Sequence, residues 1–305
     1  MDNQCGICQE VCAGENDLHI HIRRAHKMKQ KDYYLTVHPR HDLLTGEPIP
    51  FKDKDYYFGH DFVSKENMSI WVRRLSSTDQ KAYCKDLLAA RKERKALLYA
   101  PAEVELRTVM SPSVKFYEDT FGDYYTLCEQ LGFANKYKTI RIFPQNLVQA
   151  PIVTCDSREQ KPLDFDYKVA KLDFGDYKLS GPLGHVYFER KSVLDFIGTM
   201  SKGFERFSKE VLRANEKNEH LIVIVEATLA KVERFHEWLP FADKIGATSN
   251  FAFSRMRKLV QAYPNLQFLF VAGRERAVKV MTRIFQTGQD YKEIDLELAQ
   301  SKGLL

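Results

Sequence analysis

The sequence lacks any apolar run long enough to span a membrane, and its N-terminus is polar where a secretory leader would be basic and then apolar. We therefore expect a soluble, intracellular protein, in the cytoplasm or the nucleus, with no membrane partner. The chain also lacks a large excess of one charge, because 46 lysines and arginines stand against 41 aspartates and glutamates. Only local clusters of basic residues can therefore point to a polyanionic partner.

Cysteine is scarce and unevenly placed, which argues against a disulfide framework. Of the six cysteines, three lie within the first twelve residues and three stand alone. Such a cluster at one end of the chain is more typical of a metal site. The length of 305 residues is sufficient for two domains, and an apolar content of 44% is sufficient for an ordinary core.

The first 30 residues have the spacing of a zinc finger. Two residues separate the first pair of cysteines, twelve more lead to a histidine, and four more reach the next one. This spacing fits a tetrahedral zinc (Zn²⁺) site in which a β-turn supplies two thiolates and a helix supplies two imidazoles. The predicted ligands are Cys5, Cys8, His21 and His26. Leu18 is expected in the small core of the finger, and Cys12 and His19 are spare ligands.

The helix of this finger carries basic residues that favour contact with DNA phosphates. They are Arg23, Arg24 and Lys27. A single finger of this class reads only about three base pairs, so it provides little specificity alone. A finger can also bind protein or cap a fold, and these alternatives stay open.

The middle of the chain, residues 31–149, is expected to be a central, α-rich, DNA-binding region. From Lys115 to Gly132 the sequence predicts a helix, a turn and a second helix that ends at the glycine. This element resembles the small repeats that accompany homing endonucleases, and basic residues follow it. They are Lys136, Lys138 and Arg141. An aromatic helix pair is more often plain core, so both interpretations stay open.

The second half of the chain has the pattern of an α/β domain. Prolines at 144 and 151 bracket a predicted linker, after which short β-rich runs alternate with helical patterns. We expect this domain over residues 150–290 and a C-terminal tail over 291–305. The predicted strands lie at 152–155, 169–172, 177–179, 185–190, 221–225 and 268–271.

A strand, a turn and a second strand are predicted between residues 173 and 191. Side chains alternate across a strand, so Glu189 and Lys191 should share one face while Arg190 points to the other. The hairpin can place Asp176 beside Glu189, which gives two carboxylates for Mg²⁺ or Mn²⁺. The Lys191 side chain would then orient the attacking water as the ammonium, or deprotonate it as the neutral amine. Upstream, Asp156 ends a predicted strand, where it could complete the metal shell.

The ordered set Asp156-x-Arg158-Glu159, Gly175-Asp176 and Glu189-Arg190-Lys191-x-x-x-Asp195 resembles the signature of the XPF-type structure-specific nucleases. The resemblance covers about residues 150–290. It implies a restriction-endonuclease-like mixed sheet flanked by helices, dependence on Mg²⁺ or Mn²⁺, and a homodimer. It also implies that Asp176 and Glu189 ligate metal, that Lys191 positions water, and that the other acids and arginines of the signature line the site.

Two departures from this family's pattern bear on how DNA is recognised. Relatives often have an arginine directly after the glycine at position 203, whereas this chain has Phe204, so Arg206 is the residue expected to contact DNA there. The second departure is that the tandem helix-hairpin-helix motifs that follow the nuclease domain in many relatives do not follow the predicted domain here. We therefore expect a metal-dependent DNA endonuclease of a site-directed, homing type. The alternatives are a branch or flap repair nuclease, a nuclease acting on RNA, and a non-catalytic DNA-binding scaffold.

Overall fold

The computed structural model describes residues 3–140, 150–182, 184–240 and 244–305. The chain divides into two compact units, Met1–Asp86 with Met110–Pro112, and Leu87–Val109 with Ser113–Leu305. Most of the predicted linker, with Arg141 and Pro144, lies outside the described residues, as does Leu183 in the predicted hairpin turn.

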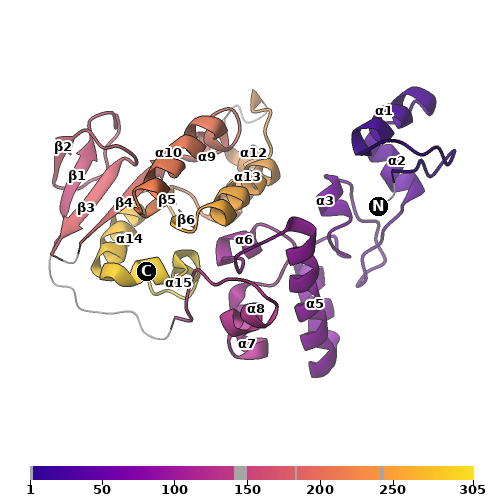
Figure 1. Cartoon of the computed structure of the whole chain (residues 1–305), viewed down its shortest axis with the longest axis horizontal. Helices are drawn as coiled ribbons and strands as arrows, with labels where there is room; N and C mark the ends of the chain where they lie inside the picture. Colours follow the sequence, from indigo (N-terminus) through magenta and orange to yellow (C-terminus); the bar gives the residue numbers. More distant parts are fainter. Residues whose placement is uncertain (1–2, 141–149, 183, 241–243) are drawn as a thin grey trace. The chain divides into compact units, whose positions relative to one another are not determined.

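The first unit is built from short helices around an aromatic core (Figure 1). Its helices are α1 (Glu15–Ala25), α2 (Gln30–Val37), α3 (Lys54–Tyr57), α4 (Lys65–Arg74) and the beginning of α5 (Ser77–Lys95). Leu18 and Ile22 of α1 pack with Tyr33, Tyr34 and Tyr57 in one buried cluster. The core expected for a finger of 30 residues therefore continues well beyond its predicted boundary.

The second unit begins within α5, at Leu87, and contains the predicted helix pair before its sheet. The helices before the sheet are α6 (Glu103–Arg107), α7 (Val114–Phe121) and α8 (Tyr124–Gln130). Gly122 has φ +89° directly after α7 and Gly132 has φ +75° just after α8, a conformation that glycine adopts without strain. Tyr117 and Tyr124 are fully buried, as in plain core. Lys136, expected to favour DNA contact, donates a hydrogen bond to the Val260 carbonyl from a half-buried position.

The rest of this unit is a six-stranded mixed sheet in the order β2-β1-β3-β4-β5-β6. The strands are β1 (Ile152–Asp156), β2 (Tyr167–Ala170), β3 (Tyr177–Gly181), β4 (Gly184–Lys191), β5 (Leu221–Val225) and β6 (Leu266–Phe270). β3 pairs antiparallel with β1 and β4, whereas the β1–β2, β4–β5 and β5–β6 pairs are parallel. Every residue of β5 and β6 is buried, as in parallel strands covered on both faces.

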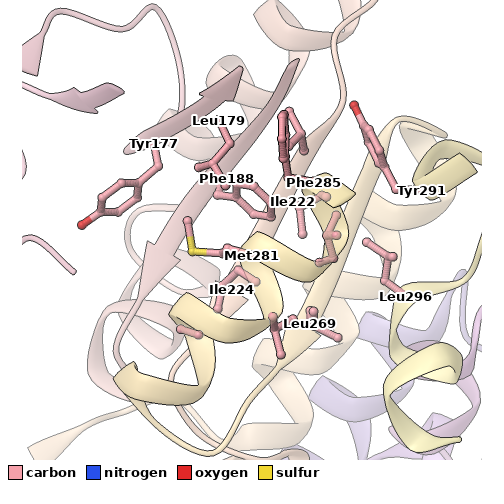
Figure 2. Packing of buried hydrophobic residues seen from close by; sticks show 14 of the residues in the cluster. Tyr177, Leu179, Phe188, Ile222, Ile224, Leu269, Met281, Phe285, Tyr291 and Leu296 are labelled. Carbon is pink, nitrogen blue, oxygen red and sulfur yellow. The ribbon is translucent and has the colours of Figure 1, made fainter. Parts of the chain in front are cut away.

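Helices cover both faces of this sheet (Figure 1). They are α9 (Val193–Met200), α10 (Phe204–Glu216), α11 (Leu229–Glu233), α12 (Phe235–Trp238), α13 (Ser249–Ala262), α14 (Arg274–Gln286), the 3-10 helix η2 (Gly288–Glu293) and α15 (Leu296–Ser301). Figure 2 shows Met281 and Phe285 of α14 beside Phe188, Ile222 and Ile224 of the strands. The mixed sheet flanked by helices that the sequence predicts is confirmed.

Residues 291–305, expected as a tail, belong to this core. Tyr291 and Leu296 are buried in the same cluster as the sheet residues (Figure 2). Glu297 accepts a hydrogen bond from the Phe270 backbone N–H at 3.1 Å, and Gln300 donates one to the Phe270 carbonyl at 2.7 Å. The segment therefore covers the open edge of β6, because its polar side chains satisfy backbone groups that would otherwise lack partners.

Among the residues that the structure describes, no helix has the length and apolar character needed to cross a membrane.

Candidate active site and metal centre

The β3–β4 hairpin sets the geometry of the predicted cleaving centre. Tyr177 pairs with Phe188, which places Asp176 at the level of Glu189. The Asp176 N–H donates to the Phe188 carbonyl at 2.8 Å, and the Arg190 N–H donates to Oδ2 of Asp176 at 2.8 Å. The hairpin therefore holds Asp176 by both its backbone and its carboxylate.

Glu189 and Lys191 come together on one face of β4, as the alternation of side chains predicts. Nζ of Lys191 lies 2.7 Å from Oε1 of Glu189. The lysine is only 6% exposed, and its ammonium lies 4.9 Å from the centre of the Phe207 ring on α10. A buried ammonium with a carboxylate partner and an aromatic ring beside it has a fixed position, which a lysine that orients a reactant requires.

The charge of Glu189 opposes ionisation of the Asp176 carboxyl group when no cation is present. Burial and the charge of Glu189 raise the pKa of Asp176 to about 8. Burial also raises the pKa of Glu189, against the lowering effect of Lys191. A divalent cation would relieve this repulsion, and carboxylate oxygens are the donors that Mg²⁺ and Mn²⁺ prefer. These side chains therefore fit the implied metal.

Arg190 points to the opposite side and joins a chain of ion pairs. Its guanidinium lies 3.1 Å from Glu159 and 3.2 Å from Glu226, and Glu226 is 3.3 Å from Arg274. This chain connects the ends of β4 and β5 to the loop after β1 and to the start of α14. Sequence reasoning missed Glu226 and Arg274, although Glu226 stands directly after a strongly predicted strand.

Asp156 and Arg158 form a hydrogen-bonded ion pair with each other. One oxygen of Asp156 accepts bonds from the Arg158 N–H and Nε, and the other accepts from Arg158 Nη2 and the Leu172 N–H, at 2.6 to 3.1 Å. Burial would raise the pKa of Asp156, but the bonds from Arg158 and the backbone outweigh it and lower that pKa. Both oxygens of Asp156 thus accept hydrogen bonds from the protein, and its place in the metal shell stays a prediction.

The remaining predicted site residues lie on the surface. Asp195 is exposed at the start of α9, where it accepts a hydrogen bond from the Ser192 hydroxyl at 2.6 Å. Ser192 in turn accepts from the Asp195 N–H, so the two residues form the N-terminal cap of α9. Arg206 is exposed on α10. A further acid that sequence reasoning missed, Glu210 of α10, accepts a hydrogen bond from the Gly175 N–H at 2.9 Å.

The predicted zinc ligands of the first unit come together. The ligand atoms of Cys5, Cys8, His21 and His26 all lie within 4.8 Å of one another, the only such group of three or more within the described part of the chain. Burial would raise the pKa of the Cys5 thiol, but hydrogen bonds from the backbone of Cys8 and its neighbours lower it to about 6. Two thiolates and two imidazoles are the donors that structural zinc prefers, so the residues fit this ion.

The spare ligands have other partners or positions. His19 Nε2 lies 3.0 Å from the Tyr34 hydroxyl and 3.1 Å from the Gln30 amide. Cys12 packs against the aromatic core of the unit and stands outside the four-residue group. The Gly6 N–H, in the loop between the two cysteine ligands, donates to the Tyr33 hydroxyl at 2.8 Å, which ties the metal loop to α2.

Comparisons with known proteins address the second unit. Residues 135–284 match the ERCC4 domain family. A solved structure described as XPF from Aeropyrum pernix in complex with DNA is similar at 20% identity and a TM-score of 0.30, over 50% of this chain and 66% of that one. This chain thus spans slightly less than two thirds of that structure. A comparison with curated proteins gave no match.

Proposed function

Because residues 135–284 are an ERCC4 domain, the domain of XPF-type nucleases, we propose that the chain is a metal-dependent endonuclease that hydrolyses phosphodiester bonds in DNA. The observation that carries this proposal is the convergence of Asp176, Glu189 and Lys191 at the end of one hairpin. Two mutually repelling carboxylates beside a buried ammonium are the parts that phosphodiester hydrolysis needs.

Each residue of this centre has a distinct task in the proposed reaction. Asp176 and Glu189 hold the metal ion, Mg²⁺ or Mn²⁺. When bound, such an ion lowers the pKa of its water and neutralises charge on the phosphate. Lys191, fixed by Glu189, orients the attacking water through its ammonium group. Arg190 anchors the end of β4 through Glu159 and Glu226 and so keeps the two acids in place.

The finger favours contact with the DNA backbone over reading of bases. In fingers of this class, the residue before the helix and its third and sixth residues contact bases. Counted from Glu15, these positions hold Gly14, Asp17 and Ile20. None of the three has the amide or guanidinium that pairs with purine edges, and only Asp17 can accept a hydrogen bond, from cytosine. The exposed basic residues lie further along the chain, at Arg23, Arg24 and Lys27.

This distribution of basic residues supports recognition of DNA shape, as in a branch or flap. It gives less support to the site-directed, homing-type targeting expected from the sequence. Phosphate contacts supply affinity and orientation but carry no sequence information. In the second unit, the exposed Arg206 on α10 is the proposed phosphate contact. We also propose a homodimer, which light scattering of the purified protein tests.

The experiment is Mg²⁺-dependent cleavage of a panel comprising duplex, flap, fork and a random-site duplex library, with RNA as competitor. Wild type is compared with Asp176→Asn and with Asp119→Asn, a control that removes an exposed acid on α7. We expect cleavage of flap or fork DNA that Asp176→Asn abolishes and Asp119→Asn retains. Enrichment of one sequence from the library would favour homing-type targeting, and no cleavage of any substrate would favour the non-catalytic scaffold.

A further inference from the structure

Helix α10 lies along the catalytic hairpin and contacts it at successive turns. Near its start, the Phe207 ring lies 4.9 Å from the Lys191 ammonium. One turn further, Glu210 bonds to the Gly175 N–H. Near its end, Arg213 donates to the Asp173 carbonyl at 3.4 Å. The face of α10 at these positions is therefore directed at the segment that carries Asp176.

Gly175 is the point at which this segment has least freedom. Its φ of +71° is strained for any residue with a side chain. A Cβ atom at this position would also lie 2.9 Å from the Phe188 carbonyl oxygen, so the strand cannot accept one. The Gly175 N–H donates to Oε1 of Glu210 at 2.9 Å, and the next N–H, of Asp176, donates to Phe188. Two consecutive amides are thus held from two different elements.

Glu210 also stands close to the acids of the centre. Burial raises the pKa of Glu189, and the negative charge of Glu210 raises it further. The negative charge of Glu210 also acts on the Arg158 guanidinium, which is hydrogen-bonded to Asp156. Asp156 accepts hydrogen bonds from four donors. Glu210 instead accepts one from the backbone N–H of Gly175, the residue directly before Asp176.

We propose that Glu210 is a positioning residue of the cleaving centre, which fixes the Gly175–Asp176 turn and thereby aims the Asp176 carboxylate at the metal. The inference rests on the proposed function. It gives an acid of α10 a supporting role in the site, which differs from the metal-ligand role expected for Asp156.

Two substitutions separate the hydrogen bond from the charge. Glu210→Gln keeps an oxygen that can accept from the Gly175 N–H, whereas Glu210→Ala removes it. Glu216→Ala is the matched control, because it removes an exposed glutamate from the same helix. The first readout needs no activity: exchange of the Gly175 amide hydrogen, followed by NMR on metal-free protein. We expect exchange at least about tenfold faster in Glu210→Ala, and near wild type in the other two.

The second readout is single-turnover cleavage of the preferred DNA at saturating Mg²⁺, with DNA affinity measured in Ca²⁺. We expect Glu210→Ala to cleave roughly 30-fold more slowly at unchanged DNA affinity, because a small misplacement of a catalytic group has a large effect on rate. Glu210→Gln should restore most of the rate. Unchanged exchange or unchanged cleavage in Glu210→Ala would overturn the proposal. Faster exchange in a protein whose wild type cuts no DNA would instead reject the proposed function and leave the Glu210 contact standing.

Discussion

Lys191 and Glu189, two residues apart on β4, meet with Nζ and Oε1 separated by 2.7 Å, while the residue between them bonds to acids on the other side of the strand. The end of β4 thus separates two roles. One face presents the reactive acid and ammonium, and the other carries the ion pairs of Arg190 that anchor the strand.

In the metal-free protein, Asp176 should make the stability of the folded state depend on pH. Its pKa is raised to about 8, from about 4 in an unfolded chain, by burial and by Glu189. The folded state therefore retains a proton that the unfolded state releases, and stability is lost as pH rises from about 4 to 8. Asp176→Asn should melt several degrees above wild type at pH 8.5, with the gain vanishing towards pH 4. A lower melting temperature at pH 8.5 would contradict this, and added Mg²⁺ should reduce the difference.

Asp156 should behave as a scaffold residue. Its pKa is lowered because the bonds from Arg158 and the backbone outweigh burial, so its contribution is present at neutral pH and is lost as pH falls through the lowered pKa. Asp156→Asn should cost about 2 kcal/mol in urea unfolding at pH 7. The affinity of the Asp156→Asn variant for Mn²⁺, measured by calorimetry, should match that of wild type. Asp164→Asn, an exposed acid on the following loop, serves as the control. Loss of Mn²⁺ binding would return Asp156 to the metal shell.

The zinc centre is tested by its ligands. Protein reconstituted with Co²⁺ should show the visible absorption of a tetrahedral site with two thiolates. Cys8→Ser should lose this spectrum and Cys12→Ser should keep it, because Cys12 stands outside the ligand group. Chelation should unfold α1 and loosen the aromatic core around Tyr33 while the sheet of the second unit stays folded, as circular dichroism can follow. An unchanged spectrum in Cys8→Ser would refute the ligand set.

The C-terminal segment should matter for stability. Leu296 is fully buried in the sheet's core, and its truncation leaves a cavity. Leu296→Ala should lower the free energy of unfolding of the second unit by about 2–4 kcal/mol. The matched substitution Leu194→Ala, at a leucine that is 49% exposed, should cost much less. Equal effects of the two substitutions would show that residues 291–305 are a detachable tail.

Local patterns were sufficient to predict the parts of the fold and site that depend on neighbouring residues. The alternation along one strand placed Glu189 with Lys191, and the hairpin placed Asp176 beside them. The ligand spacing of the finger likewise brought Cys5 and His26 together, because a turn and one helix determine the whole geometry.

Contacts between distant elements left no such signal. Glu210 reaches Gly175 across 35 positions, and only the packing of α10 on the hairpin brings them together. The segment expected as a C-terminal tail holds Asp295 and Glu297, and both are buried against backbone N–H groups of other elements.

The most direct test of the cleaving centre is single-turnover cleavage of the preferred DNA in Mg²⁺ by wild type, Glu189→Gln and Lys191→Ala. Lys168→Ala, on the exposed strand β2, is the control. Both centre variants should cut at least about 10²-fold more slowly while binding DNA normally in Ca²⁺, since each lacks a group that acts on the reacting atoms. Cleavage by either variant at close to the wild-type rate would contradict the assignment of Glu189 and Lys191 as catalytic residues.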